Sequence, residues 1–302
     1  MLHGVFYWIL NMSVTASLSG AVVLLLRRLR WIPRRVSVHF WWIPCLRMVI
    51  PVGLTSPWSL ISLLAKITAK AVYPPGWKDH FTALNYMQAA ESYFPIQYRA
   101  EALETVFRVA SVLWLIPALG ILGLLGICYG SSMREVRRAR PLEKGLFAAE
   151  GTGAPGVYGI LRPRILVPGG AEPEELSLIL LHEQTHIRRC DNLWRLLGIT
   201  VSAIHWFNPL GWVFLRCFLE DLELSCDELV LSRLGPDRRK DYARFLLTCK
   251  ARTPAFASGF GGAKLRTRIE NILSFRKLTW VSLVAFLALT AVVFCVLLTN
   301  GM

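Results

Sequence analysis

The sequence predicts a mainly α-helical, polytopic membrane protein with four transmembrane helices, and a helical domain with a small β element inserted between the third and fourth. Hydrophobic residues make up 54% of the 302 residues and the mean hydropathy is +0.44, so the chain is too apolar for an ordinary soluble domain. Several uncharged runs are each long enough to cross a hydrocarbon core of about 30 Å. Between the last two of them lies His-Glu-Gln-Thr-His at 182–186, a spacing typical of zinc sites.

Three of these runs carry no charged residue, namely Val5 to Leu26, Val109 to Met133 and Leu278 to Met302. A fourth run is interrupted only by Arg47 and by two prolines, and we expect it to cross the bilayer once. The expected organisation is a membrane domain at 1–130 with spans at about 5–26, 36–55 and 109–130, a zinc metalloprotease domain at 131–277, and a fourth transmembrane helix at 278–299.

The distribution of charge predicts how these spans are oriented. Residues 27–35 hold five arginines and no acid, and the segment after the third span is also basic, whereas residues 66–104 balance four basic residues with four acidic ones. The positive-inside rule then places 27–35 and 131–277 in the cytoplasm, and both termini and 66–104 outside. The net charge of +14 is therefore a topology signal. No direct contact with nucleic acid is expected, because these arginines flank spans and no recognition motif accompanies them.

The pattern at 182–186 is the strongest candidate for chemistry. His182 and His186 are four residues apart, so on a helix they project from one face and can reach one metal ion. Glu183 lies beside them, where a carboxylate can take a proton from a water at the metal. The acids and the proline at 172–175 favour the start of a helix there. A polar helix face with two solvated histidines is the alternative.

A zinc site of this kind needs a third protein ligand, and the best candidate is Glu223. It lies on a helix predicted to open at Asn208 and Pro209. Asp227, four residues later, is expected to orient a ligand histidine through its other ring nitrogen. Cys226 is a less favoured ligand, because such sites are usually completed by a carboxylate or a histidine. One zinc ion per chain is expected. For any single acid of this helix, the alternative is a place on a solvated acidic face.

A fifth apolar run, Leu196 to Leu215, tests this ligand set. If the run crossed the membrane, His186 and Glu223 would lie on opposite faces and could not share a metal. Its centre, residues 205–209, contains His, Asn and Pro and is a poor middle for a lipid-facing span. We therefore expect a helical hairpin that turns there, with its tip near or within the inner leaflet. His205 is a further candidate, with either a transition-state role or a structural one.

Residues 157–168 favour extended structure, because Val, Ile and Tyr alternate with Gly and Pro. A short strand pair or an edge strand is expected just before the helix that carries the two histidines. Such an edge could hold a peptide as an added strand. A strand that only packs against the helix is an equal alternative.

The chain resembles the BlaR/MecR-type antirepressor membrane zinc metallopeptidases of bacteria. The resemblance extends over nearly all 302 residues and is carried, in order, by PGVYGILRPRILVP, LLHEQTHIRRCDNLWRLL, HWFNPLGW and ELSCDELVL. It implies a gluzincin-like site with His182, His186 and Glu223 as zinc ligands and Glu183 as catalytic base. It also implies a multi-pass protein of the bacterial cell membrane, whose protease cleaves a cytoplasmic DNA-binding repressor or the receptor itself.

The best-known members carry an external C-terminal penicillin-binding domain that senses β-lactams, and we expect this domain to be lacking here. The sequence ends at Met302, directly after the last predicted span. A signal is then expected to enter through residues 66–104 or through a partner, unless the chain is a fragment.

A membrane-embedded zinc endopeptidase of regulated signalling is the expected function. The alternatives are a housekeeping metalloprotease for membrane-protein quality control and a non-catalytic membrane sensor or adaptor. The expected partners are the lipid bilayer, a protein substrate such as a repressor, and the chain itself as a homodimer or by self-cleavage. The basic segment 251–277 is the expected place for a self-cut, because it is tethered near the site. A passive basic linker on anionic lipid is the alternative.

Overall fold

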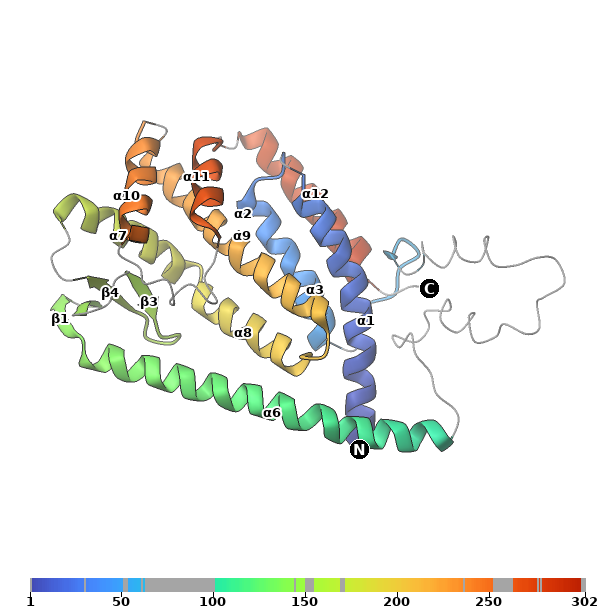
Figure 1. The fold of residues 1–302 in the computed structure, drawn as a ribbon. Helices are drawn as coiled ribbons and strands as arrows, with labels where there is room; N and C mark the ends of the chain where they lie inside the picture. The colour runs from blue at the N-terminus through green and yellow to red at the C-terminus, as the bar shows by residue number, and fades with distance from the viewer. Residues whose placement is uncertain are drawn as a thin grey trace.

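A computed structural model of the chain describes residues 2–29, 31–50, 54–60, 62, 101–143, 145–149, 155–168, 172–235, 237–251, 263–275, 277 and 279–299 (Figure 1). The chain is mainly helical, as the sequence predicts, and has one small sheet. The helices are α1 (Leu2–Arg27), α2 (Arg34–Ser37), the 3-10 helix η1 (Val38–Trp41), α3 (Trp42–Val49), α6 (Glu101–Arg138), α7 (Pro173–Arg188), α8 (Asp191–Ile204), α9 (Pro209–Leu234), α10 (Arg239–Ala251), α11 (Leu265–Leu273) and α12 (Trp280–Leu298). The strands are β1 (Arg140–Glu143), β2 (Leu146–Ala149), β3 (Gly156–Tyr158) and β4 (Arg164–Pro168).

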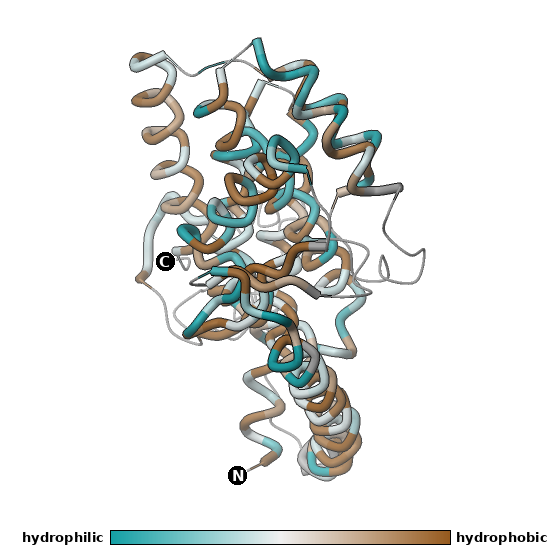
Figure 2. The backbone as a smooth tube through the Cα atoms, turned by 90° about the vertical axis from the view of Figure 1, so that its left-hand side faces the viewer, coloured by the Kyte–Doolittle hydropathy of each residue, from teal (hydrophilic) through white to brown (hydrophobic). Residues whose placement is uncertain are grey.

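Among the described residues, three helices are long and apolar enough to cross a membrane: α1, residues 105–138 of α6, and α12. They coincide with the first, third and last predicted spans. Half of the apolar window of α1 is buried inside the protein, but only 17% of that of α6 and 11% of that of α12. α6 and α12 therefore turn most of their apolar side chains outward, as lipid-facing helices do. In Figure 2, which views α6 nearly end-on at the bottom, brown and white residues predominate along it.

The second predicted span differs from the helix that the structure contains. α2, η1 and α3 follow one another as a helical run from Arg34 to Val49, shorter than the expected 36–55. The backbone of Ile50 is extended, with φ −104° and ψ 113°, because residue 51 is a proline and helical geometry before a proline is disfavoured. Four membrane spans thus stay a prediction. The predicted outer segment 66–104 lies outside the described residues except for the first turn of α6.

Arg47, the charge that interrupts this run, is buried at the end of α12. Its guanidinium donates to the main-chain oxygens of Leu297 and Thr299, at 2.6 Å each. The last carbonyl groups of a helix have no partner within the helix. Arg47 therefore caps α12 and ties its C-terminal end to α3.

The predicted turn of the hairpin is confirmed: α8 ends at Ile204 and α9 begins at Pro209. The side chain of Asn208 caps α9 by accepting a hydrogen bond from the backbone of Leu210 at 3.0 Å. Gly20 of α1 lets the ring of Phe214 from α9 lie against its backbone, since an added Cβ there would overlap that ring. The hairpin thus packs closely against the first helix.

The tip of the hairpin is held by α1, α3 and α6. The ring nitrogens of His205 lie 2.9 Å from the hydroxyl of Ser13 and 3.0 Å from the carbonyl oxygen of Met48. The indole of Trp114 donates to the carbonyl oxygen of Ile204 at 2.8 Å. Ser13 is about 21 Å along α1 from Arg27 at the helical rise per residue. The tip therefore reaches deep between the apolar helices.

At the other end of α1, arginine and acid side chains join the loop after α1 to α9. Asp221 is fully buried and accepts hydrogen bonds from Nε of Arg27, at 3.0 and 2.9 Å, and from the indole of Trp41, at 2.8 Å. Glu220 accepts from the same arginine at 2.9 Å. We call this group, Arg27, Trp41, Glu220 and Asp221, the ionic clamp.

Glu228, two turns further along α9, binds the start of α2. Its two carboxylate oxygens accept the backbone N–H groups of Arg34 and Arg35, at 3.0 and 3.1 Å. The first N–H groups of a helix lack partners within the helix, and an acid is favoured there. The acids of α9 therefore do not form a solvated face, and part of the arginine cluster that indicates topology also holds the fold together.

The four strands form one sheet in the order β1-β2-β4-β3, with β2 and β4 parallel and the other pairs antiparallel. This confirms the strand pair expected within residues 157–168. The sheet shares a core with α7, α9, α10 and α11 that includes Ile165, Ile179, Val230 and Tyr242. The segment expected to be a linker, 251–277, thus contains α11, which packs on α9 and α10, while residues 252–262 lie outside the described residues.

The ionic clamp predicts a large loss of stability when its buried acid is removed. Asp221→Ala leaves Arg27 and Trp41 without their partner, and we expect the free energy of unfolding to fall by about 3–5 kcal/mol. Tryptophan fluorescence during denaturant unfolding in detergent measures it. Asp241→Ala, which removes an exposed pair with Arg238, is the control and is expected to cost less than about 1 kcal/mol. Equal losses in the two variants would contradict the clamp.

Candidate metal centre

Two histidines of α7 face α9 from one side of the helix. α7 starts with Pro173 and has two glutamates in its first turn, which favour a helix start. His182 and His186 are both buried, and their Nε2 atoms lie 3.2 Å apart. The helical spacing thus brings together two nitrogens at a distance that suits neighbouring ligands of one metal ion.

The other ring nitrogen of His186 is bound by a carboxylate. Nδ1 lies 2.6 Å from Oδ2 of Asp191, at the first residue of α8. Cys190 has a left-handed backbone, with φ 55°, and lets the chain turn back so that Asp191 faces α7. We assign a proton to Nδ1, so Nε2, on the side of His182, is the ring nitrogen of His186 that would bind a metal ion. The sequence interpretation missed Asp191, although an acid just after the helix was the available signal.

The other ring nitrogen of His182 is bound by a tyrosine. Nδ1 lies 2.8 Å from the hydroxyl of Tyr242 on α10, and that hydroxyl donates to Oδ1 of Asp227 at 2.7 Å. Burial, and then the charge of Asp227, raise the pKa of Tyr242 well above its usual value, so the hydroxyl keeps its proton. Asp227 itself lies 3.7 Å from Nδ1 of His182. The expected contact between Asp227 and a histidine is therefore relayed by Tyr242, which no sequence motif marks.

The carboxylate of Glu223 completes a triangle with the two histidines. One oxygen lies 3.8 Å from Nε2 of His182 and the other 3.8 Å from Nε2 of His186. In a tetrahedral zinc site with bonds of about 2.0–2.1 Å, ligand atoms are separated by about 3.4 Å. The three groups could therefore hold a zinc ion after small side-chain movements.

Two arginines also contact this carboxylate. Arg195 of α8 donates to Oε1 of Glu223, and Arg268 of α11 lies 3.4 Å from Oε2. Arg268 also binds both oxygens of Asp227, at 2.8 and 2.7 Å. Burial alone would raise the pKa of Glu223, but His186 and the two arginines hold that pKa well below its usual range. Glu223 is thus ionised, as a carboxylate that binds a metal must be. No local pattern in the sequence marks either arginine.

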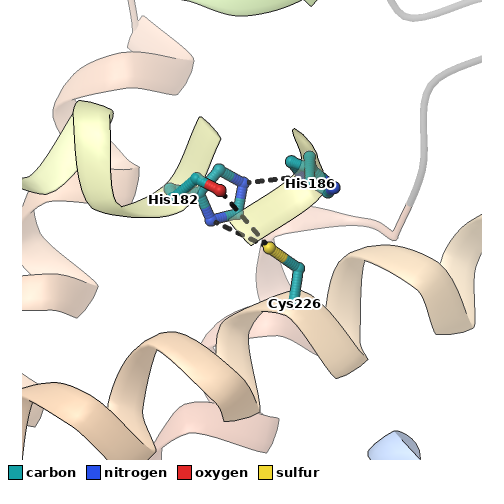
Figure 3. A group of neighbouring side chains, drawn as sticks. All are labelled: His182, His186 and Cys226. Carbon is teal, nitrogen blue, oxygen red and sulfur yellow. Dashed lines mark hydrogen bonds between the residues drawn. The ribbon is translucent and has the colours of Figure 1, made fainter. Parts of the chain in front are cut away.

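A second candidate donor set replaces the carboxylate with a thiol. His182, His186 and Cys226 form a buried group that could hold a metal ion (Figure 3). The sulfur lies 3.6 Å from Nδ1 of His182, the nitrogen that already contacts Tyr242. The Nε2 atoms instead face Glu223. Burial raises the pKa of Cys226 and so disfavours the thiolate that metal binding requires. The carboxylate set fits better.

Glu183, the neighbour of His182 in the sequence, is buried and has a raised pKa. Burial raises the pKa of its carboxyl group, and the nearby carboxylate of Glu223 adds to the rise, although His186 and the arginines oppose it. A carboxylate with a raised pKa takes up a proton more readily near neutral pH. Its place beside the two histidines suits proton transfer to and from a water held there.

The structure does not bring His205 into this group. Both of its ring nitrogens are engaged by α1 and α3, and α8 separates it from α7 by about 21 Å of helix. These contacts support the structural alternative for His205.

At the edge strand β3, the side chain of Asn192 donates to the carbonyl oxygens of Val157 and Gly159, at 3.0 and 3.1 Å. A peptide added to this part of the edge would have to replace Asn192.

The two donor sets predict different metal contents. With His182, His186 and Glu223 as ligands, the purified protein is expected to carry about one zinc ion per chain. Glu223→Ala should lose it, because two ligands remain, while Cys226→Ala should retain it. Elemental analysis of protein purified without added chelator measures both, with Asp241→Ala, which removes an exposed acid of α10, as the control. Zinc lost from Cys226→Ala and kept by Glu223→Ala would favour the thiol set.

Comparison with known proteins identifies the family of the chain. Residues 7–272 match the family described as BlaR1 peptidase M56. The chain is 29% identical over 133 residues, 41% of its length, to the regulatory protein BlaR1 of Bacillus licheniformis, and 28% identical over 99 residues, 32% of its length, to the methicillin resistance mecR1 protein of Staphylococcus aureus. The aligned parts cover 22% and 17% of these two relatives. Since the family match spans most of the sequence, the chain belongs to the BlaR1 peptidase M56 family.

Proposed function

We propose that this protein is a membrane-embedded, gluzincin-like zinc endopeptidase of regulated signalling, with His182, His186 and Glu223 as zinc ligands. The observation that carries the proposal is the pair of Nε2 atoms 3.2 Å apart, each on a ring whose Nδ1 is already bonded. Such partners fix the ring orientation and raise the basicity of the ligand nitrogen. Family membership supports peptidase chemistry at this pair.

Each residue has a distinct part in the proposed reaction. Zinc, when bound, would polarise a peptide carbonyl and acidify a water. Glu183 accepts a proton from that water on its carboxylate and then donates it to the nitrogen of the leaving amine. Asp191 holds the ring of His186, and Asp227 holds that of His182 through Tyr242.

We also propose a location for the site relative to the membrane. The ionic clamp joins the basic end of α1 to α9, and basic residues gather at the cytoplasmic ends of spans. Glu223 follows Asp221 by two residues on α9, so the catalytic domain lies just inside the inner surface. Both termini are then outside, and the helical run from Arg34 to Val49 is the second of the four proposed spans.

The proposed substrate is a cytoplasmic protein, with a DNA-binding transcriptional repressor as the first choice. The support is the resemblance of the chain to bacterial antirepressor peptidases and the names of the relatives, a regulatory protein and a methicillin resistance protein. The chain itself is a second candidate substrate. α11, which packs on α9, belongs to the segment in which a self-cut is proposed.

The role of Glu183 can be tested by a change of one atom. Glu183→Gln removes the base but keeps the size of the side chain, so zinc should stay bound while cleavage falls at least ~10²-fold. The assay mixes the full chain with a DNA-binding repressor from the same bacterium and follows both proteins by mass spectrometry. Gln184→Ala, the exposed neighbour, is the control and should cleave normally. Undiminished cleavage by Glu183→Gln would place the base elsewhere.

The proposed topology can be tested separately from activity. Reporter fusions or single-cysteine labels at positions 75, 145, 240 and 302 should read outside, inside, inside and outside. The reason is that α8 and α9 form a hairpin between positions 145 and 240. Because the hairpin turns back without crossing, both positions should lie on the same side of the membrane. A label at 240 that reads outside would mean that the hairpin crosses, and the orientation proposed here would be wrong.

A further inference from the structure

An open groove of about 540 Å³ lies between the last turns of α6 and the turn that joins β3 to β4. Arg137 lines it from α6, and Arg162 and Arg164 line it from the turn and the start of β4. No carboxylate occurs among the described residues that line it. The groove is therefore strongly basic, and none of its residues belongs to the metal centre.

Apolar and aromatic side chains line the same groove. Leu161, at the tip of the turn, is 95% exposed, and Tyr129 of α6 is 43% exposed. A single exposed leucine is ordinary on a protein surface. A groove that combines arginines, an exposed leucine and a tyrosine near the end of an apolar helix is instead typical of a membrane interface.

The position of the groove along α6 also indicates a membrane interface. The uncharged run of α6 ends at Met133, and Arg134 is the next residue. Tyr129 lies about one turn before this boundary and Arg137 about one turn after it. If α6 crosses a bilayer, the groove straddles the depth at which hydrocarbon gives way to headgroups.

The turn that forms one wall has a fixed shape. Gly159 has φ +88°, and an added Cβ there would lie 3.0 Å from the carbonyl oxygen of Arg162. The two hydrogen bonds from Asn192 hold the carbonyl groups of Val157 and Gly159 to the start of α8. The turn is therefore a built feature that projects Leu161 outward.

We propose that this groove binds an anionic phospholipid of the membrane surface. The headgroup phosphate lies among Arg137, Arg162 and Arg164, because guanidinium groups pair with phosphate oxygens through two hydrogen bonds. An acyl chain lies along Tyr129 and Leu161, which a free phosphate could not cover. The site docks the small sheet onto the bilayer and does not depend on peptidase activity.

Titration with dioleoylphosphatidylglycerol tests the proposal. The full chain is purified in detergent, and native mass spectrometry counts the retained lipid as its concentration rises. Each arginine near a membrane surface contributes about fivefold to the affinity for anionic lipid, so Arg137→Gln/Arg162→Gln/Arg164→Gln should bind at least ~10-fold more weakly. Leu161→Glu should also weaken binding, through the acyl chain. Dioleoylphosphatidylcholine should bind weakly to all variants.

The matched control removes three positive charges elsewhere. Arg238→Gln/Lys240→Gln/Arg244→Gln alters exposed residues at α10, which packs on α7 and α11. This triple variant should keep the affinity of the parent. Equal losses in both triple variants, no loss in the groove variant, or full competition by millimolar inorganic phosphate or an acidic peptide would each overturn the proposal. Unchanged zinc content and melting temperature show that a variant is folded.

Discussion

The ionic clamp between α1 and α9 is the contact on which the rest of the structure depends. α9 is one continuous helix whose first half belongs to the hairpin and whose second half carries Glu223 and Asp227. A smooth apolar helix could slide along its neighbours at little cost, because lipid and side chains are equally apolar. The buried carboxylate of Asp221, held by Arg27 and Trp41, fixes α9 along its axis. That contact sets where Glu223 lies relative to α1, while a hydrogen bond of 3.1 Å from Arg233 of α9 to Thr185 of α7 joins α9 to the helix of the histidines.

The centre that results is dense in charge. Arg195 and Arg268 meet Glu223, and Arg268 also holds Asp227, so the carboxylates are neutralised by guanidinium groups. A buried acid without such partners would be protonated or would unfold the domain. A metal ion at Glu223, as proposed, would replace one positive partner of this carboxylate with another, which would limit the electrostatic cost of both forms. Arg268 stands on α11, so the segment next to the last span takes part in this balance.

Local spacing in the sequence was enough to predict much of this centre, because helical periodicity acts over a few residues. It predicted the facing pair His182 and His186, the candidate Glu223, and the turn at the middle of the fifth apolar run. It could not predict Tyr242 or the arginines on α8 and α11, since their contacts join residues far apart in the chain. The second helix is shorter than predicted for a local reason, the proline at 51. The predicted span of 36–55 followed the length of the apolar run and passed over this proline.

The cap that Arg47 places on α12 has a consequence for how this helix can vary. Its guanidinium binds main-chain oxygens, which every amino acid supplies, so the contact does not depend on which side chains α12 carries. It depends on where the helix ends. Removing one residue would shift that end by about 1.5 Å and rotate it by about 100°. The sequence of α12 can therefore drift widely among apolar residues, while its length is held constant.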